Sequence, residues 1–315
     1  MSYARHTFLK GYSALLEHNF AIKVRESIVK LLLNNSITIK LLQFFLFYYL
    51  DLKIKEQNRV VLLYQMGKVG SRTIRRSLEA LGIPVYHVHQ LRRIEKALKE
   101  HHSKIWILTL LNYSWFALYF KKHQNNLDYK KWKLISLVRD PIARNVSLFF
   151  ENFRLALPKI IRMKKAPITL ENIRDLFLYD FPNHNFPLSW FNEEMKQIFG
   201  IDVFTEEFPK TQGYKIYTGK HLDLLLLKLE QLNDCASVAF NEFLGIKGFT
   251  LRNANLTKEK DYFSIYKKFI SAKILPESYV EKLYASKFSR HFYTEEELNI
   301  FRKKWLAERV NENGQ

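Results

Sequence analysis

Residues Val60-Val-Leu-Leu-Tyr64, together with the loop Gln65-Met-Gly-Lys-Val-Gly-Ser-Arg-Thr73 that follows them, decide the fold class of this chain. The first stretch is a continuous apolar run, which is typical of a strand buried on both faces of a parallel sheet. The loop leads into Ser71 to Leu81, where apolar residues recur at helical spacing. A buried strand, a glycine-containing loop and a helix in this order predict an α/β protein.

Later stretches repeat this alternation. Val85 to His89 predicts a second strand and Leu134 to Val138 a further one, after which a helix opens at Pro141. Tyr214 to Tyr217 and Leu222 to Lys228 are strand candidates in the second half of the chain. We therefore expect a mostly parallel central sheet flanked by helices.

The first 58 residues read as helical. We expect residues 1–58 to form a helical N-terminal extension and residues 59–315 to form one α/β domain. Within the extension, the most apolar part, residues 37–50, is interrupted by Lys40 and Gln43 and falls short of the roughly 20 apolar residues that span a bilayer. It fits either a buried packing helix or an interfacial helix that contacts a membrane surface. No signal peptide is evident, so we expect a cytoplasmic location, in solution or peripherally at the inner face of the membrane.

The chain is strongly basic, with a formal net charge of +19 from 50 Lys and Arg against 31 Asp and Glu. Such a charge predicts anionic partners, among them a phosphorylated small ligand and an acidic glycan. Nucleic acid is not an expected partner, because we find no helix-turn-helix signature or basic tract. Cys235 is the only cysteine, which excludes a disulfide framework and a Cys-based zinc site. No metal is predicted.

The loop after the first strand is a candidate anion site. A helix N-terminus directs backbone N–H groups and a positive dipole at an anion, and glycines allow close approach of the backbone. Lysine adds a charge, and the hydroxyl groups add donors. The predicted ligand-binding residues are Gly67, Lys68, Val69, Gly70, Ser71, Arg72 and Thr73. An ordinary glycine turn would show the same short pattern. The order differs from a Walker A loop, in which the lysine follows the last glycine.

A second candidate site is Arg139-Asp-Pro-Ile-Ala-Arg-Asn-Val-Ser147. Asp140 is a natural N-cap and Pro141 a natural first residue of a helix. Arg139 then lies at the carboxyl end of a strand, where ligands bind in open α/β sheets. An arginine fork with the Ser147 hydroxyl suits a phosphate monoester. Alternatively, Arg139 bonds Asp140 and Ser147 is a passive helix residue.

Together the two loops resemble the sulfotransferases that use 3′-phosphoadenosine 5′-phosphosulfate (PAPS). Lys68-Val-Gly-Ser-Arg-Thr73 is similar to that family's 5′-phosphosulfate loop, and Arg139-Asp-Pro with Arg144 and Ser147 is similar to its 3′-phosphate motif. The nearest likeness is to bacterial proteins of capsular polysaccharide synthesis, through three further blocks: Trp190-Phe-Asn-Glu-Glu-Met-Lys196, Gly200-Ile-Asp-Val-Phe204 and His291-Phe-Tyr-Thr-Glu-Glu-Glu297. The resemblance covers about Val60 to Trp305. It implies a P-loop-containing, sulfotransferase-like fold, PAPS as donor and a glycan hydroxyl as acceptor.

The resemblance also implies roles for individual residues. Lys68 would neutralise the leaving phosphate oxygen, while Arg139 and Ser147 would hold the 3′-phosphate. A general base must take the acceptor proton, and histidine suits neutral pH. His87 and His89 share one face of the second predicted strand, and His89 is favoured because it lies nearer the carboxyl end. His87 and an acid stay open as candidates, and both histidines could instead be structural.

Two other enzyme classes are compatible with a nucleotide and a surface polysaccharide. A P-loop kinase would need a Walker A loop and an aspartate that holds Mg²⁺, and the first of these is absent from the sequence. A glycosyltransferase of surface polysaccharide synthesis is the other alternative, although no Asp-x-Asp stands out. We therefore favour the sulfotransferase interpretation.

Overall fold

The computed structural model describes residues 36–92, 115–126, 129–164, 169–252 and 262–307. By packing, the chain divides into two compact units, Met1–Gln57 with Lys96–Lys122 and Asn58–Glu95 with His123–Gln315. The division expected from the sequence, at residues 58 and 59, differs from this grouping in the placement of Lys96–Lys122. Most of that segment, like residues 1–35 of the expected extension, lies outside the described residues, and the domain boundary stays a prediction.

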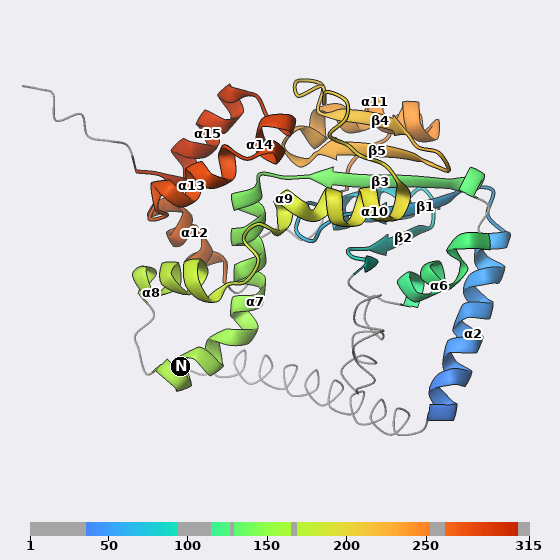
Figure 1. The fold of residues 1–315 in the computed structure, drawn as a ribbon, viewed down its shortest axis with the longest axis horizontal. Helices are drawn as coiled ribbons and strands as arrows, with labels where there is room; N and C mark the ends of the chain where they lie inside the picture. Colours follow the sequence, from blue (N-terminus) through green and yellow to red (C-terminus); the bar gives the residue numbers. More distant parts are fainter. Residues whose placement is uncertain (1–35, 93–114, 127–128, 165–168, 253–261, 308–315) are drawn as a thin grey trace, which may run out of the picture. The chain divides into compact units, whose positions relative to one another are not determined.

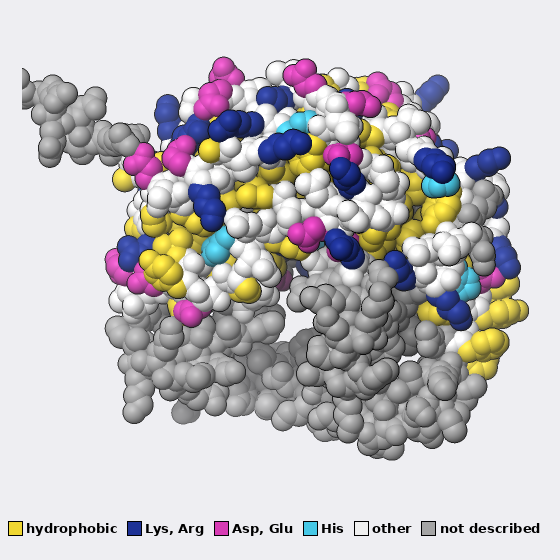
Figure 2. Space-filling model, in the orientation of Figure 1, with side chains coloured by type: hydrophobic (Ala, Val, Ile, Leu, Met, Phe, Trp, Pro, Cys, Tyr) yellow, Lys and Arg dark blue, Asp and Glu magenta, His cyan; other side chains and the backbone are white. Residues whose placement is uncertain are grey.

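The described part of the first unit consists of α2 (Ser36–Lys55) and most of α6 (Trp115–His123). Phe47 of α2 is buried, with its ring edge-on to Tyr119 at 5.8 Å, and the Tyr119 hydroxyl donates to Asp51 at 2.9 Å. The opposite side of α2 is apolar and exposed, and hydrophobic side chains gather along this helix in Figure 2. Its exposed residues are Phe44, Phe45, Tyr48, Tyr49 and Leu52. Among the helices in the described ranges, none combines the length and apolar character that crossing a bilayer requires.

A five-stranded sheet forms the centre of the second unit (Figure 1). Its strands are β1 (Val60–Tyr64), β2 (Val85–Val88), β3 (Trp132–Val138), β4 (Tyr214–Thr218) and β5 (Asp223–Lys228). They lie in the order β2-β1-β3-β5-β4; the first four are parallel and β4 runs antiparallel at one edge. The predicted mostly parallel sheet is confirmed.

The apolar runs of the sequence fill the core of this unit. Every side chain of β1 is buried, as are those of Leu224 to Leu227 in β5, as expected for strands covered on both faces. On one face, Tyr64 packs against Trp190 and Phe199. These two residues belong to a continuous helical segment made of α9 (Phe186–Trp190), a π-helical stretch (Phe191–Lys196) and α10 (Gln197–Phe199).

Further helices flank the sheet. Among them, α3 (Ser71–Glu79) contacts β2, and α11 (Leu232–Leu244) contacts β4 and β5. The others are α7 (Pro141–Lys164), α8 (Leu170–Asp175) with its π-helical continuation (Leu176–Asp180), α12 (Phe263–Ser271), α13 (Glu277–Tyr284), α14 (Lys287–Phe292) and α15 (Glu295–Trp305). Short 3₁₀ turns span Gln124–Asn126, Tyr129–Lys131 and Leu229–Gln231. The last of these helices, α15, begins with a capping box between Thr294 and Glu297.

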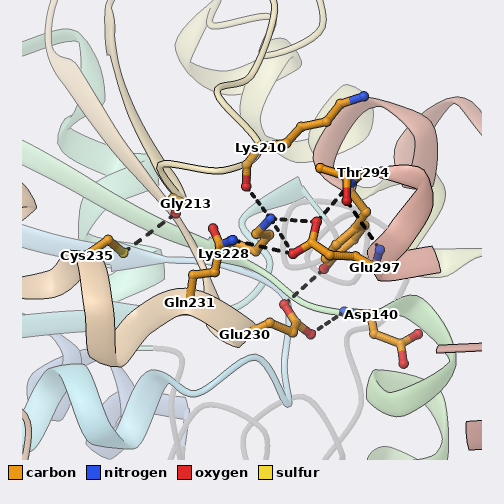
Figure 3. A network of polar contacts seen from close by, with 10 residues as sticks. Asp140, Lys210, Gly213, Lys228, Glu230, Gln231, Cys235, Thr294 and Glu297 are labelled. Atoms are coloured by element: carbon orange, nitrogen blue, oxygen red, sulfur yellow. Dashed lines mark hydrogen bonds and ion pairs between the residues drawn. The ribbon is translucent and has the colours of Figure 1, made fainter. Parts of the chain in front are cut away.

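An ion pair between a buried lysine and a partly exposed glutamate joins the C-terminal helix to the sheet (Figure 3). Lys228, the last residue of β5, has no exposed surface, and its Nζ donates to both carboxylate oxygens of Glu297, at 2.8 and 2.9 Å. The same ammonium also donates to the carbonyl of Lys210. Lys228 thus holds α15 against the carboxyl end of β5.

The strand order places the candidate loops side by side. β1 has β2 on one side and β3 on the other. The order in which successive strands join the sheet therefore reverses at β1. The two strands are parallel neighbours, with Leu63 opposite Ile135. The loops that follow them therefore meet at the carboxyl edge of the sheet, at the topological switch point where open α/β sheets bind ligands.

Candidate active site

The loop between β1 and α3 requires glycine at position 70. Gly70 has φ 96°, and a Cβ at this position would lie 2.6 Å from Cδ1 of Leu229. Lys68 also adopts a positive φ, 72°, although it is not a glycine. Gly67 is more open, since a Cβ there would meet only Nε2 of His89, at 4.0 Å. The tight backbone at Gly70 and the open side at Gly67 suit a loop that wraps around a small ligand.

The remaining predicted loop residues differ in how they could reach a ligand. Val69 is fully buried, so only its backbone can contribute, whereas Arg72 is exposed. Ser71 is buried in the first turn of α3. Thr73 is half-buried and its N–H donates to the Gly70 carbonyl at 3.1 Å. The amides of Ser71 and Arg72 lie where helical N–H groups have no intrahelical acceptor, which makes them available to an anion.

Two arginines tie the two candidate loops into one site. Arg139 donates from Nη1 to the carbonyl of Lys68 at 2.8 Å, and Arg144 donates from Nε to the carbonyl of Gly67 at 3.1 Å. Arg144 is buried and lies over the ring of Phe186, 4.8 Å from its centroid. Burial, with Arg139 nearby, lowers the pKa of Arg144 to about 10, so the guanidinium stays charged at neutral pH. The motifs predicted separately from the sequence are therefore in contact.

Asp140 sets the start of α7 next to Arg139. Its Oδ1 accepts from the N–H of Ile142 at 2.9 Å, as the predicted N-cap requires, and from the hydroxyl of Tyr284 at 3.1 Å. Its Oδ2 accepts from Nε1 of Trp305 at 3.4 Å. Burial raises the pKa of this carboxyl group. Asp140 thus bonds the N-terminus of its own helix and the C-terminal helices.

Glu230, in the 3₁₀ turn after β5, supports the start of α7 as well (Figure 3). Its Oε1 accepts from the backbone N–H of Asp140 at 2.8 Å, and its Oε2 accepts from the hydroxyl of Tyr293 at 3.2 Å. These bonds use both carboxylate oxygens within the protein. Glu230 therefore serves the structure of the site.

One face of α7 runs along the anion loop. Arg144, Ser147 and Glu151 follow one another at intervals of three and four residues, which places them on one helical face. Arg144 contacts the carbonyl of Gly67, and Oε2 of Glu151 lies 3.0 Å from Nζ of Lys68. Ser147 lies between them in this series and is half-buried. Glu151 was missed by sequence reasoning, because its only signal is the helical spacing from Ser147.

His89 directs one ring nitrogen toward the loop. Its Nδ1 lies 2.9 Å from the carbonyl of Gln65, which can only accept, so Nδ1 carries the proton. Nε2 then holds a lone pair and is the atom that borders Gly67. Burial lowers the pKa of His89, and Arg144 and Lys68 lower it further, although the Gln65 bond opposes this. A neutral imidazole with its basic nitrogen beside the anion loop has the form of a general base.

His87 lies within β2, whereas His89 follows the end of that strand, and the environments of the two rings differ. Its ring packs edge-on against His89, with centroids 4.4 Å apart. Its Nε2 is buried and, within the described residues, has no hydrogen-bond partner. Burial lowers the pKa of His87 to about 3, with contributions from His89, Arg75 and Arg72. It is a weaker proton acceptor than His89.

Comparison with known proteins gives a match to a family model. Residues 161–294 match a family model described as "Putative capsular polysaccharide synthesis protein". No curated protein matches the chain, and no solved structure matches it. The matched residues run from the end of α7 to the residue before α15, so both anion loops precede them. Within the described ranges, His, Cys, Asp and Glu side chains form no cluster that could hold a metal ion.

Proposed function

We propose that this chain is a sulfotransferase of P-loop-like fold that moves a sulfuryl group from PAPS to a hydroxyl of a surface polysaccharide. The observation that carries the proposal is the pair of arginine bonds to the carbonyls of Gly67 and Lys68. These bonds make one site from two anion-binding motifs. A single site with two anion-binding parts suits a nucleotide that carries a phosphosulfate at one end and a phosphate at the other.

The donor would bind across the switch point of the sheet. Lys68, the N–H groups at the start of α3 and the hydroxyls of Ser71 and Thr73 would hold the 5′-phosphosulfate. Arg139 and Ser147 would hold the 3′-phosphate and so fix the position of the nucleotide. The lysine precedes the second glycine, unlike the lysine of a Walker A loop, which favours this donor over ATP.

Transfer would need one proton acceptor and one charge-neutralising group. The acceptor oxygen attacks sulfur, its proton moves to Nε2 of His89, and the bond from sulfur to the bridging oxygen breaks. The electron pair of that bond stays on the 5′-phosphate of 3′,5′-adenosine bisphosphate, where Lys68 offsets the charge. The lowered pKa of His89 supports its role, because the ring is then neutral and ready to accept a proton.

The family match supports a polysaccharide as the acceptor. Its description concerns the synthesis of capsular polysaccharide, and the net charge of +19 suits an acidic glycan. The exposed face of α2 supports a further proposal, that this helix contacts a membrane surface. Aromatic residues on one side of a helix with lysines in its last turn, here Lys53 and Lys55, suit the bilayer interface.

Calorimetric titration with 3′,5′-adenosine bisphosphate tests the donor. We expect saturable binding of one nucleotide that does not depend on Mg²⁺. A preference for ATP with Mg²⁺ would favour a kinase, and a preference for a sugar nucleotide would favour a glycosyltransferase. Either result, or no binding at high micromolar concentrations, would overturn the donor assignment.

The His89→Ala variant tests the base. Transfer of radioactive sulfur from PAPS is measured with a panel of neutral and uronic acid-containing polysaccharides. We expect turnover to fall by about 10² or more, with nucleotide affinity near that of the wild type. His87→Ala is the matched control, and a larger loss in that variant would move the base to His87.

A further inference from the structure

The ammonium group of Lys68 already has a carboxylate partner in the donor site. Oε2 of Glu151 lies 3.0 Å from Nζ of Lys68, and the side chains of the two residues are 34% and 17% exposed. This pair joins the anion loop to α7, across 83 residues of sequence. The ammonium that would meet the phosphosulfate is therefore engaged before any donor arrives.

A third residue holds the carboxylate in place. The hydroxyl of Tyr262 donates to the same Oε2 of Glu151 at 2.8 Å. Tyr262 is buried and packs its ring near that of Phe150, with centroids 6.1 Å apart. Because Tyr262 anchors the carboxylate independently of Lys68, Glu151 has a reason to stay on α7 when the lysine moves.

The position of Glu151 is unusual for a site that attracts anions. It lies one turn beyond Ser147 on the face of α7 that borders the loop, so its negative charge is next to the proposed phosphate positions. A carboxylate beside a multiply charged anion repels it, so a glutamate at this position weakens anion binding. The contacts indicate a compensating role, which is to pair with the ammonium of Lys68.

We propose that Glu151 is the resting counter-ion of Lys68, and that the donor must compete with it for the ammonium group. This inference rests on the proposed PAPS site and names Glu151 as a positioning residue within it. In the empty site the pair holds Lys68 close to the loop. When the phosphosulfate binds, its oxygens replace the carboxylate, which stays bonded to Tyr262.

Binding of 3′,5′-adenosine bisphosphate to full-length protein tests this competition by calorimetry. We expect Glu151→Gln to bind about three- to tenfold more tightly than the wild type, because the nucleotide no longer has to break an ion pair. Glu296→Gln, which removes the same charge at an exposed position of α15, is the matched control and should bind like the wild type. Equal affinity of the wild type and Glu151→Gln, or weaker binding by the variant, would overturn the inference.

A double-mutant cycle separates competition for Lys68 from simple repulsion by the carboxylate. We expect Glu151→Gln to tighten binding more when Lys68 is present than in the Lys68→Met background. An equal effect in both backgrounds would mean that Glu151 acts only as a repelling charge, and would exclude the counter-ion role. Should Glu151→Gln fold poorly, Tyr262→Phe provides a second test. We expect its binding to be about two- to threefold weaker than that of the wild type, because the displaced carboxylate loses the hydrogen bond that holds it on α7. Unchanged or tighter binding by this variant would contradict the inference.

The same measurements keep this inference distinct from the proposed function. If neither the wild type nor any variant binds the nucleotide, the donor assignment itself fails. If the wild type binds and Glu151→Gln gives no gain, the donor assignment stands and only the role of Glu151 is lost.

Discussion

Nη1 of Arg139 donates a hydrogen bond to the backbone carbonyl of Lys68, at 2.8 Å. The bond joins the end of β3 to the loop after β1, so the residue proposed for the 3′-phosphate also shapes the site for the 5′-phosphosulfate. A planar guanidinium can bond a carbonyl and a phosphate at once, whereas an ammonium acts as a point charge.

Arg139→Lys tests this double role while keeping the charge. We expect affinity for 3′,5′-adenosine bisphosphate to fall by about 10- to 100-fold, since the fork geometry is lost at both contacts. Lys133→Arg is the control. It makes the opposite exchange of lysine for arginine in β3, away from the site, and should leave nucleotide affinity unchanged. Wild-type affinity in Arg139→Lys would mean that charge alone is needed.

Gly70→Ala is predicted to damage the anion loop through a steric clash. The new Cβ would lie 2.6 Å from Leu229, in a backbone conformation with φ 96°. We expect a loss of about 2–4 kcal/mol in the free energy of unfolding, measured by urea denaturation. Gly82→Ala is the matched control, because φ there is 73° but no atom lies within 4 Å of the new Cβ. That variant should lose only about 1–2 kcal/mol, and an equal loss in the two would exclude the clash.

Glu297→Gln is predicted to destabilise the protein by leaving the buried ammonium of Lys228 without its counter-ion. Glutamine preserves the capping box, so the change removes charge and little else. We expect a loss of about 3 kcal/mol or more in the free energy of unfolding. Glu295→Gln lies in the same turn but breaks only an exposed pair with Arg302, and should cost less than about 1 kcal/mol. Similar losses of unfolding free energy in both variants would show that burial of the Lys228 ammonium does not increase the cost of removing its counter-ion.

His87 is predicted to make the protein less stable in acid. Its folded pKa is about 3, against an ordinary value of 6.5. Between these values the unfolded chain binds the additional proton, so stability falls as pH falls below 6.5, by up to about 1.4 kcal/mol per pH unit. His87→Gln should flatten this part of the dependence of Tm on pH. The same change at the exposed His221 should leave the dependence as in the wild type, and an unaltered profile for His87→Gln would contradict the prediction.

The exposed face of α2 predicts binding to lipid vesicles. Replacing Phe44, Tyr48 and Leu52 with serine should reduce co-sedimentation with vesicles that contain anionic lipid by about tenfold or more, since apolar area and charge act together at the interface. Replacing the exposed Leu81, Val238 and Ile300 of the other unit with serine is the control. Equal sedimentation of both triple variants would remove α2 from the membrane contact.

Residues that act within one local segment could be predicted from the sequence. The continuous apolar run of β1 and the N-cap at Asp140 both follow from a few neighbouring residues, and both are confirmed. The loop after β1 was recognised for the same reason. The assignment of this loop to PAPS, and the roles of Lys68 and His89, stay predictions.

Contacts between distant segments could not be predicted. The pairing of Lys68 with Glu151 and the bond from Arg144 to Gly67 depend on how α7 lies against the loop. No local pattern distinguishes Glu151 from an ordinary exposed acid of a helix. Likewise, the proton position on His89 depends on the carbonyl of Gln65, which directly follows β1 and lies 24 residues away in sequence.

The order of the strands also determines which segments of the chain could fold independently. Of the five strands in the described residues, the segment that matches the capsular polysaccharide family model, residues 161–294, contains β4 and β5, which form one edge of the sheet. Cut out alone, it would expose the flank of β5 that β3 covers and would separate Lys228 from Glu297. The matched segment is therefore not an autonomous module, and any exchange of it between proteins must preserve the surface of β3 and the start of α15.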